Sequence, residues 1–117
     1  MNPTISIVIP VFNEEDVLSQ LYTRVSQVMD GLDLTWELIL VNEGSADDSA
    51  AIIKELCNQD SRVKGISFSR NFGFQEAVTA GLARSAGEAV ILSDADLQDP
   101  PELFPEMIAK WHEGFDV

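Results

Sequence analysis

Short apolar runs alternate with amphipathic stretches along the whole chain. The runs are ISIVIPVF (residues 5–12), WELILV (36–41), VKGISFS (63–69) and EAVILSDA (88–95), and their length and composition predict strands. Apolar residues recur at helical spacing over residues 13–32, 48–60, 72–86 and 100–114. Strand and helix therefore alternate through four βα units. This order predicts an α/β protein with a Rossmann-like, mostly parallel sheet and helices on both faces.

Polar residues before the helical stretches mark their expected starts. Asn13 is the expected N-cap of the first helix, with residues 14–16 placing negative charge in its first turn. Ser45 and Asp48 have the spacing of a capping box. Asp99, which precedes two prolines, is the expected cap of the last helix. These residues have a local structural explanation that needs no ligand.

Composition and charge fit one acidic domain that spans residues 1–117. Hydrophobic residues make up 45% of the chain, which is enough for a core. Twenty acidic residues against 7 basic ones give a formal net charge of -13, which argues against nucleic acid or an anionic lipid surface as a direct partner. A ligand that carries phosphate would need a divalent cation between itself and the protein.

The cysteine content and the N-terminal pattern bear on the compartment. Cys57 is the only cysteine and lies on the inward side of the second predicted helix, so no disulfide framework is expected and a reducing compartment is favoured. The chain shows no signal-peptide pattern and no apolar run near the ~20 residues that a bilayer span requires. We therefore expect this chain to be cytoplasmic.

Acidic residues gather just after the predicted strands. In an open parallel sheet, ligands bind beyond the carboxyl ends of the strands. At the end of the fourth strand, Asp94 and Asp96 can share a hard cation, and oxygen ligands suit Mg²⁺ or Mn²⁺. Capping does not explain Glu43, whose carboxylate accepts hydrogen bonds when it is ionised. An N–H group of a nucleobase would be a fitting donor to it.

Four segments together carry a family resemblance. They are IVIPVFNEE, VNEGSADDS, SRNFGFQEAVTAGL and DADLQDPPEL. In this order and spacing they resemble the inverting glycosyltransferases of family 2, which have a GT-A fold, over nearly all 117 residues. The most similar branch transfers a sugar from a nucleotide donor, of UDP-glucose or GDP-mannose type, to a polyprenyl phosphate. The resemblance also implies that the full-length protein lies at the cytoplasmic face of a membrane.

The resemblance assigns donor-binding roles to residues of the first two segments. Pro10, Phe12 and Glu14 fall where the family's first loop surrounds the nucleobase and ribose. Glu43 stands where the family usually has a base-binding Asp, and it is one methylene longer. A misplaced carboxylate would weaken binding, so the substitution Glu43→Asp is expected to retain or tighten the affinity for the nucleotide.

Further roles fall on the last two segments. The resemblance makes Arg70 a neighbour of the diphosphate. It makes Asp94, Asp96 and Gln98 the acidic motif that holds the ribose and the metal-bound diphosphate, with Mg²⁺ or Mn²⁺ as the metal. Phe74 departs from the polar residue that relatives often carry there. Catalytic residues are not assigned, because the family's acceptor half would follow the last residue of this chain.

The length of the chain adds two expectations. A family member would run on through an acceptor half, so the 117 residues are expected to form an incomplete, donor-binding domain that transfers sugar weakly or not at all. A sheet edge that the missing part would cover predicts self-association into a homo-oligomer. A phosphate acceptor needs no strong general base, and His112, the only histidine, is expected at the surface of the last helix.

Other functions stay open at the level of sequence. A family 2 enzyme with a saccharide acceptor and a non-catalytic module that binds nucleotide or Mg²⁺ share the same motifs. A phosphoacceptor receiver-like module is disfavoured because no lysine follows a late strand in the required place. A nucleotidyltransferase would prefer a glycine-rich basic loop after the first strand, and PVFNEED has neither glycine nor positive charge.

Overall fold

A four-stranded parallel sheet forms the centre of the molecule. The computed structural model describes residues 3–95 and 100–114. The strands β1 (Ile5–Val11), β2 (Trp36–Asn42), β3 (Val63–Ser67) and β4 (Ala89–Leu92) lie in the order β3-β2-β1-β4. Every adjacent pair is parallel. The predicted α/β class is confirmed, and the sheet is parallel throughout its described strands.

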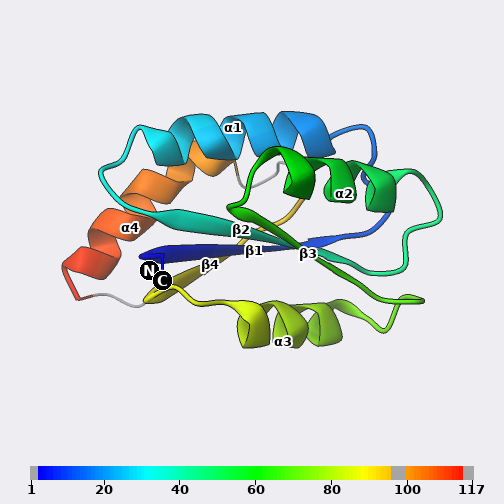
Figure 1. The fold of residues 1–117 in the computed structure, drawn as a ribbon. Coiled ribbons are helices and arrows are strands. Elements are labelled where there is room, and N and C mark those ends of the chain that lie inside the picture. Colours follow the sequence, from blue (N-terminus) through cyan, green and yellow to red (C-terminus); the bar gives the residue numbers. More distant parts are fainter. Residues whose placement is uncertain (1–2, 96–99, 115–117) are drawn as a thin grey trace.

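Helices cover both faces of the sheet, as predicted. The helices α1 (Leu18–Asp30), α2 (Ser49–Gln59) and α4 (Phe104–His112) lie over one face, and α3 (Phe74–Arg84) lies over the other (Figure 1). A short 3-10 helix, η1 (Pro101–Leu103), leads directly into α4. Such two-sided cover explains why the first two strands are apolar at almost every position.

The core has a larger and a smaller half, one on each side of the sheet. Alternate residues of β1, Ile5, Ile7 and Ile9, join the larger half with side chains from α1 and α4. Val8 points to the other side and packs in the smaller half. There a Cβ added at Gly81 would lie 2.3 Å from a methyl carbon of Val8. Glycine at this position therefore lets α3 approach the sheet closely.

The starts of the helices differ from the sequence prediction. Asn13 is not the N-cap of α1, which begins at Leu18 after a turn. Asn13 has φ 54° and uses its side chain to bind the loop that follows β2. Ser45 and Asp48 form no capping box. The N-cap residue Asp48 makes no side-chain capping bond, and Ser45 Oγ accepts a hydrogen bond from the backbone of Asn13. The predicted cap Asp99 lies outside the described residues.

Element ends also shift by a few residues. The third helix begins at Phe74 and not at Phe72, because Gly73 precedes it with φ 102°. The fourth strand ends at Leu92, so Asp94 follows the strand. Cys57 packs, half-buried, against the larger core, and burial raises the pKa of its thiol. His112 is exposed, as predicted, beside the ring of Trp111.

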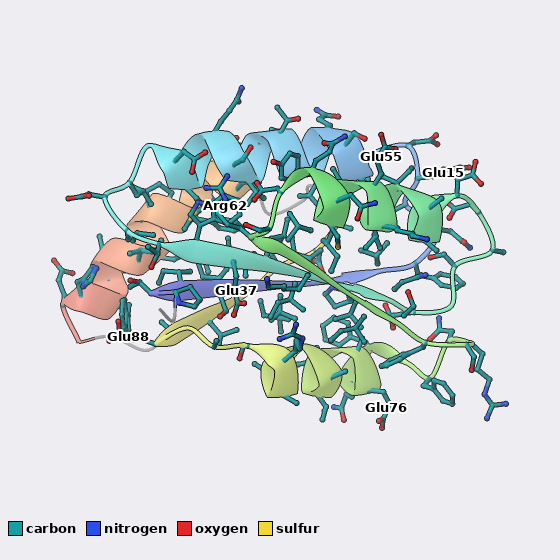
Figure 2. The ribbon with its side chains drawn as sticks, in the orientation of Figure 1. Glu15, Glu37, Glu55, Arg62, Glu76 and Glu88 are labelled. Atoms are coloured by element: carbon teal, nitrogen blue, oxygen red, sulfur yellow. The ribbon has the colours of Figure 1, made fainter. Side chains whose placement is uncertain are left out.

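A buried polar contact closes the end of the sheet opposite the carboxyl ends of the strands. Ser6 Oγ donates to Glu37 Oε2 (2.6 Å), and the backbone N–H of Ala86 donates to the same oxygen (2.7 Å). The backbone N–H of Gly87 donates to Ser6 Oγ (2.8 Å). Glu37, labelled in Figure 2, therefore ties β1 and β2 to the segment after α3. Within the described residues, no helix has the length and apolar character to span a membrane.

Candidate functional site

An open hollow of about 210 Å³ lies where β1, β2 and β4 end. It is lined by Pro10, Phe12, Glu14, Glu43, Phe74, Asp94 and Ala95. The chain leaves β1 toward β2 on one side, and β4 later pairs with β1 on the other side. The direction of the crossovers reverses here, and such a switch point is where open α/β sheets bind ligands.

The structure brings together residues that the sequence placed in three separate segments. Pro10, Phe12 and Glu14 follow from β1, Glu43 follows β2, and Asp94 follows β4. Backbone pairing continues past the strands, because the N–H of Glu43 donates to the carbonyl of Val11 (2.8 Å). The parallel register of the strands therefore places these side chains at the same edge of the sheet.

Glu43 is a buried carboxylate with free acceptor capacity. It is only 8% exposed, and its side chain makes no hydrogen bond or ion pair with any other described residue. Burial raises the pKa of this carboxyl group, because desolvation disfavours the charged form. A ligand N–H group that reached the hollow would replace solvent at an acceptor that makes no hydrogen bond within the described part of the protein.

Two aromatic rings border the hollow. Phe12 is 43% exposed and Phe74 is 52% exposed, which is high for side chains of this size. Flat apolar surfaces of this kind stack well against a heterocyclic base. The sequence interpretation treated Phe74 only as a departure from a polar family position. Its position directly after Gly73, near the start of the helix that follows the third strand, was the signal in the sequence that it could face the site.

Arg70 lies beside the site without lining it. Its guanidinium carbon is 4.8 Å from the ring centroid of Phe72, and the side chain is exposed. Its backbone packs against Gly44, where an added Cβ would lie 2.5 Å from the carbonyl carbon of Arg70. Gly44 has φ 76°, so glycine is required there for both conformation and space. This contact holds the segment of Arg70 against the loop of Glu43.

The predicted metal ligands are only partly within the described chain. Asp94 is half-buried beyond β4, and pairing of the Ser93 N–H with the Val8 carbonyl (3.0 Å) holds it at the hollow. Asp96 and Gln98 lie outside the described residues. Among the residues that are described, no three or more His, Cys, Asp or Glu side chains form a group that could hold a metal ion. The chemistry of Asp94, a carboxylate at the mouth of the site, fits a hard cation.

A parallel sheet with an acidic and aromatic hollow at its switch point defines a ligand-binding α/β domain of Rossmann-like type. The family model "Glycosyl transferase family 2" matches residues 6–117. The chain therefore belongs to glycosyl transferase family 2, and its sheet and helices match the GT-A fold of solved glycosyltransferases.

Similar proteins are longer than this chain. An uncharacterized glycosyltransferase, YkcC, of Bacillus subtilis is 54% identical over 112 residues, which are 96% of this chain and 35% of that protein. The undecaprenyl-phosphate 4-deoxy-4-formamido-L-arabinose transferase of Proteus mirabilis is 45% identical over 114 residues, 97% of this chain and 35% of that protein. The chain thus spans about a third of the length of these curated relatives.

A solved structure of a similar protein contains both a nucleotide and a metal. Glucosyl-3-phosphoglycerate synthase from Mycobacterium tuberculosis, in complex with Mn²⁺, UDP and phosphoglyceric acid, superposes with a TM-score of 0.69 at 30% identity. The match covers 93% of this chain and 39% of that protein. The correspondence in fold therefore extends over nearly all of the present chain.

Proposed function

We propose that this chain is the donor-binding part of a glycosyltransferase that transfers a sugar from a nucleoside-diphosphate sugar to a polyprenyl phosphate, with inversion. The observation that carries the proposal is the hollow at the switch point, where Glu43, Phe12 and Asp94 meet. Membership of family 2 supports the reaction class, and the Proteus mirabilis relative, named for transfer to undecaprenyl phosphate, supports the acceptor. The full-length protein would then act at the cytoplasmic face of a membrane.

The base of the donor would occupy the inner part of the hollow. Glu43 would accept a hydrogen bond from a base N–H, which supplies the partner that its buried carboxylate lacks among the described residues. Phe12 would contact the plane of the base, while Pro10 and Glu14 complete the wall around base and ribose. Uracil and guanine both present a suitable N–H, so UDP and GDP donors share this chemistry.

The diphosphate would lie toward Asp94. With a formal net charge of -13, the protein repels a bare diphosphate, so a divalent cation is required between them. Asp94, with Asp96 and Gln98, would hold Mg²⁺ or Mn²⁺, which neutralises charge on the departing nucleoside diphosphate. Arg70, whose guanidinium lies over the ring of Phe72, would approach the diphosphate by turning away from that ring.

The transfer step needs little proton chemistry from this part of the protein. An oxygen of the acceptor phosphate, already an anion, would attack the anomeric carbon. The bond from that carbon to phosphate forms as its bond to the nucleoside diphosphate breaks, and the electron pair leaves with the diphosphate. No proton has to be removed from the nucleophile. The acceptor-binding groups would belong to the part of the full-length protein beyond this chain, which spans about a third of the length of its relatives.

Thermal unfolding with donor nucleotides tests the proposal directly. The panel is UDP, GDP, UDP-glucose and GDP-mannose, each with Mn²⁺, with Mg²⁺ and with EDTA. A ligand present at ~100 times its dissociation constant adds ~2.7 kcal/mol, which raises the midpoint of a domain this size by roughly 10 °C. We expect one nucleotide family to give such a shift only with metal. A chain that is folded by circular dichroism and shows no shift with any ligand would contradict the proposal.

A variant of Glu43 tests the assignment of the base contact. Calorimetric titration of Glu43→Asp with the nucleotide that shifts the parent chain should show equal or tighter binding, because the shorter carboxylate is the one that the family resemblance associates with base binding. A tenfold loss of affinity in Glu43→Asp would show that the longer side chain of Glu43 is required in this protein.

A further inference from the structure

Asn13 joins the loops that follow β1 and β2. Its Oδ1 accepts hydrogen bonds from the backbone N–H groups of Ala46 (2.8 Å) and Asp47 (3.4 Å). Its own backbone N–H donates to Ser45 Oγ (2.9 Å). The bonded residues are more than 30 positions apart in the chain, so the contact is tertiary and not a local turn.

The two residues after Asn13 extend this contact. The backbone N–H of Glu14 donates to Ser49 Oγ (3.0 Å), and that of Glu15 donates to Asp47 Oδ2 (3.2 Å). In the opposite direction, the backbone N–H of Asp48 donates to Glu15 Oε2 (3.2 Å). We call the bonds between residues 13–15 and residues 45–49 the loop clasp. Figure 2 labels Glu15, which lies at this end of the molecule.

The backbone of Asn13 adopts a conformation that few residues accept. Its φ of 54° is in the left-handed region, and among the described residues it is the one non-glycine residue with positive φ. Asparagine tolerates this region better than other residues with a side chain. Asn13 lies between Phe12 and Glu14, and both of these neighbours line the hollow. Asn13 itself does not line it.

We propose that Asn13 is a positioning residue of the candidate nucleotide site. Through the loop clasp, Asn13 holds the loop that carries Phe12 and Glu14 against the loop that carries Glu43. This inference rests on the proposed function, because it assigns to Asn13 an effect on the nucleotide bound by its neighbours. A preformed arrangement of two loops spares the ordering that binding would otherwise require.

The substitution Asn13→Gly separates conformation from hydrogen bonding. Glycine keeps access to positive φ but removes the acceptor Oδ1. We expect calorimetry with UDP and with GDP, each in the presence of Mn²⁺, to show about tenfold weaker binding than in the parent chain. Asn13→Asp retains an acceptor oxygen and should bind more tightly than Asn13→Gly. The control Tyr22→Phe loses a hydrogen bond to Asp60 (2.7 Å) away from the hollow, and it should keep the affinity of the parent.

Hydrogen exchange without nucleotide tests the loop clasp separately. The amides of Ala46 and Asp47 should exchange faster in Asn13→Gly than in the parent, while those of the central strands should not change. Equal nucleotide affinity in Asn13→Gly and the parent, or an equal loss in Tyr22→Phe, would overturn the positioning role. If the parent binds neither nucleotide, the proposed function fails. If the amides of Ala46 and Asp47 exchange equally fast in Asn13→Gly and in the parent, Asn13 does not organise the two loops.

Discussion

At the scale of the residue, Glu43 places a carboxylate in the candidate site at a cost in stability. The residue is mostly buried, its carboxylate at the hollow has no partner among the described residues, and desolvation raises its pKa. The folded protein therefore binds this proton more tightly than the unfolded chain does. The contribution of Glu43 to the free energy of unfolding consequently falls as the pH rises from the ordinary glutamate pKa through the raised one.

The substitution Glu43→Gln should raise the melting temperature of the chain at about pH 8, because it removes the buried charge. The gain should shrink toward zero near pH 4, where most of Glu43 is protonated in both the folded and the unfolded parent chain. Thermal unfolding at several pH values measures the difference. Glu88→Gln is the matched control, since Glu88 is exposed and its substitution should change the melting temperature little at either pH. A gain in Glu43→Gln that is the same at every pH would contradict this account.

At the scale of secondary-structure elements, an ionic cluster fastens the ends of two helices to the starts of two strands. Arg62, before β3, donates to Asp30 (2.6 Å), the last residue of α1. It also donates to Asp60 (2.9 Å), which directly follows α2. Its guanidinium lies 4.1 Å from the ring centroid of Trp36, the first residue of β2. Tyr22 donates to Asp60 from the middle of α1. Figure 2 shows Arg62 toward the end of the molecule opposite Glu15.

Asp60 is the residue of this cluster on which stability should depend most. The hydrogen bond from Arg62 holds the pKa of its carboxyl group well below the usual range. We expect Asp60→Asn to lower the free energy of unfolding by about 1 to 3 kcal/mol in denaturant titrations at neutral pH. The loss should diminish in acid, because the stabilisation by the ionised carboxylate is present above the unfolded-state pKa and disappears as the pH falls through the folded-state value.

Asp33→Asn controls for the change in net charge. Asp33 is exposed and makes no hydrogen bond or ion pair with the described residues, so its substitution removes one negative charge from an acidic protein without breaking a contact. A loss of stability in Asp33→Asn as large as that in Asp60→Asn would show that the cluster is not the cause.

At the scale of the whole molecule, the sheet ends in an apolar edge at β4. This strand pairs with β1 along one side, and no described strand pairs with its other side. Leu92 is 44% exposed on β4, and it borders an open hollow of about 370 Å³ whose apolar lining includes Leu103 and Met107. Unpaired strand edges with exposed apolar side chains promote association. The other edge strand, β3, carries Lys64, a charge that disfavours such pairing.

We expect the chain to self-associate through this edge at high concentration. Sedimentation velocity over a range of concentrations should show oligomers for the parent chain, and Leu92→Lys should shift the distribution toward monomer. Lys64→Leu, at the opposite edge of the sheet, is the comparison that should not reduce association. A parent chain that stays monomeric at the highest concentration would contradict the expectation.

The sequence by itself determined the class of the fold and the neighbourhood of the site. Apolar runs such as ISIVIPVF specify buried strands, because a strand covered on both faces needs apolar side chains at successive positions. Since the carboxyl ends of parallel strands meet at one edge, the sequence also placed Phe12, Glu43 and Asp94 together before their contacts were known.

Only the tertiary structure decided which polar side chains pair. Asn13 and Ser45 looked like helix caps because capping depends on local spacing, yet they bind each other's loops, and the partners are 32 residues apart in the chain. Glu37 was not distinguished within an apolar strand, although Ser6 and the segment after α3 satisfy its carboxylate. These bonds depend on strand order and register, which bring distant backbone groups within hydrogen-bonding distance and which no local pattern encodes.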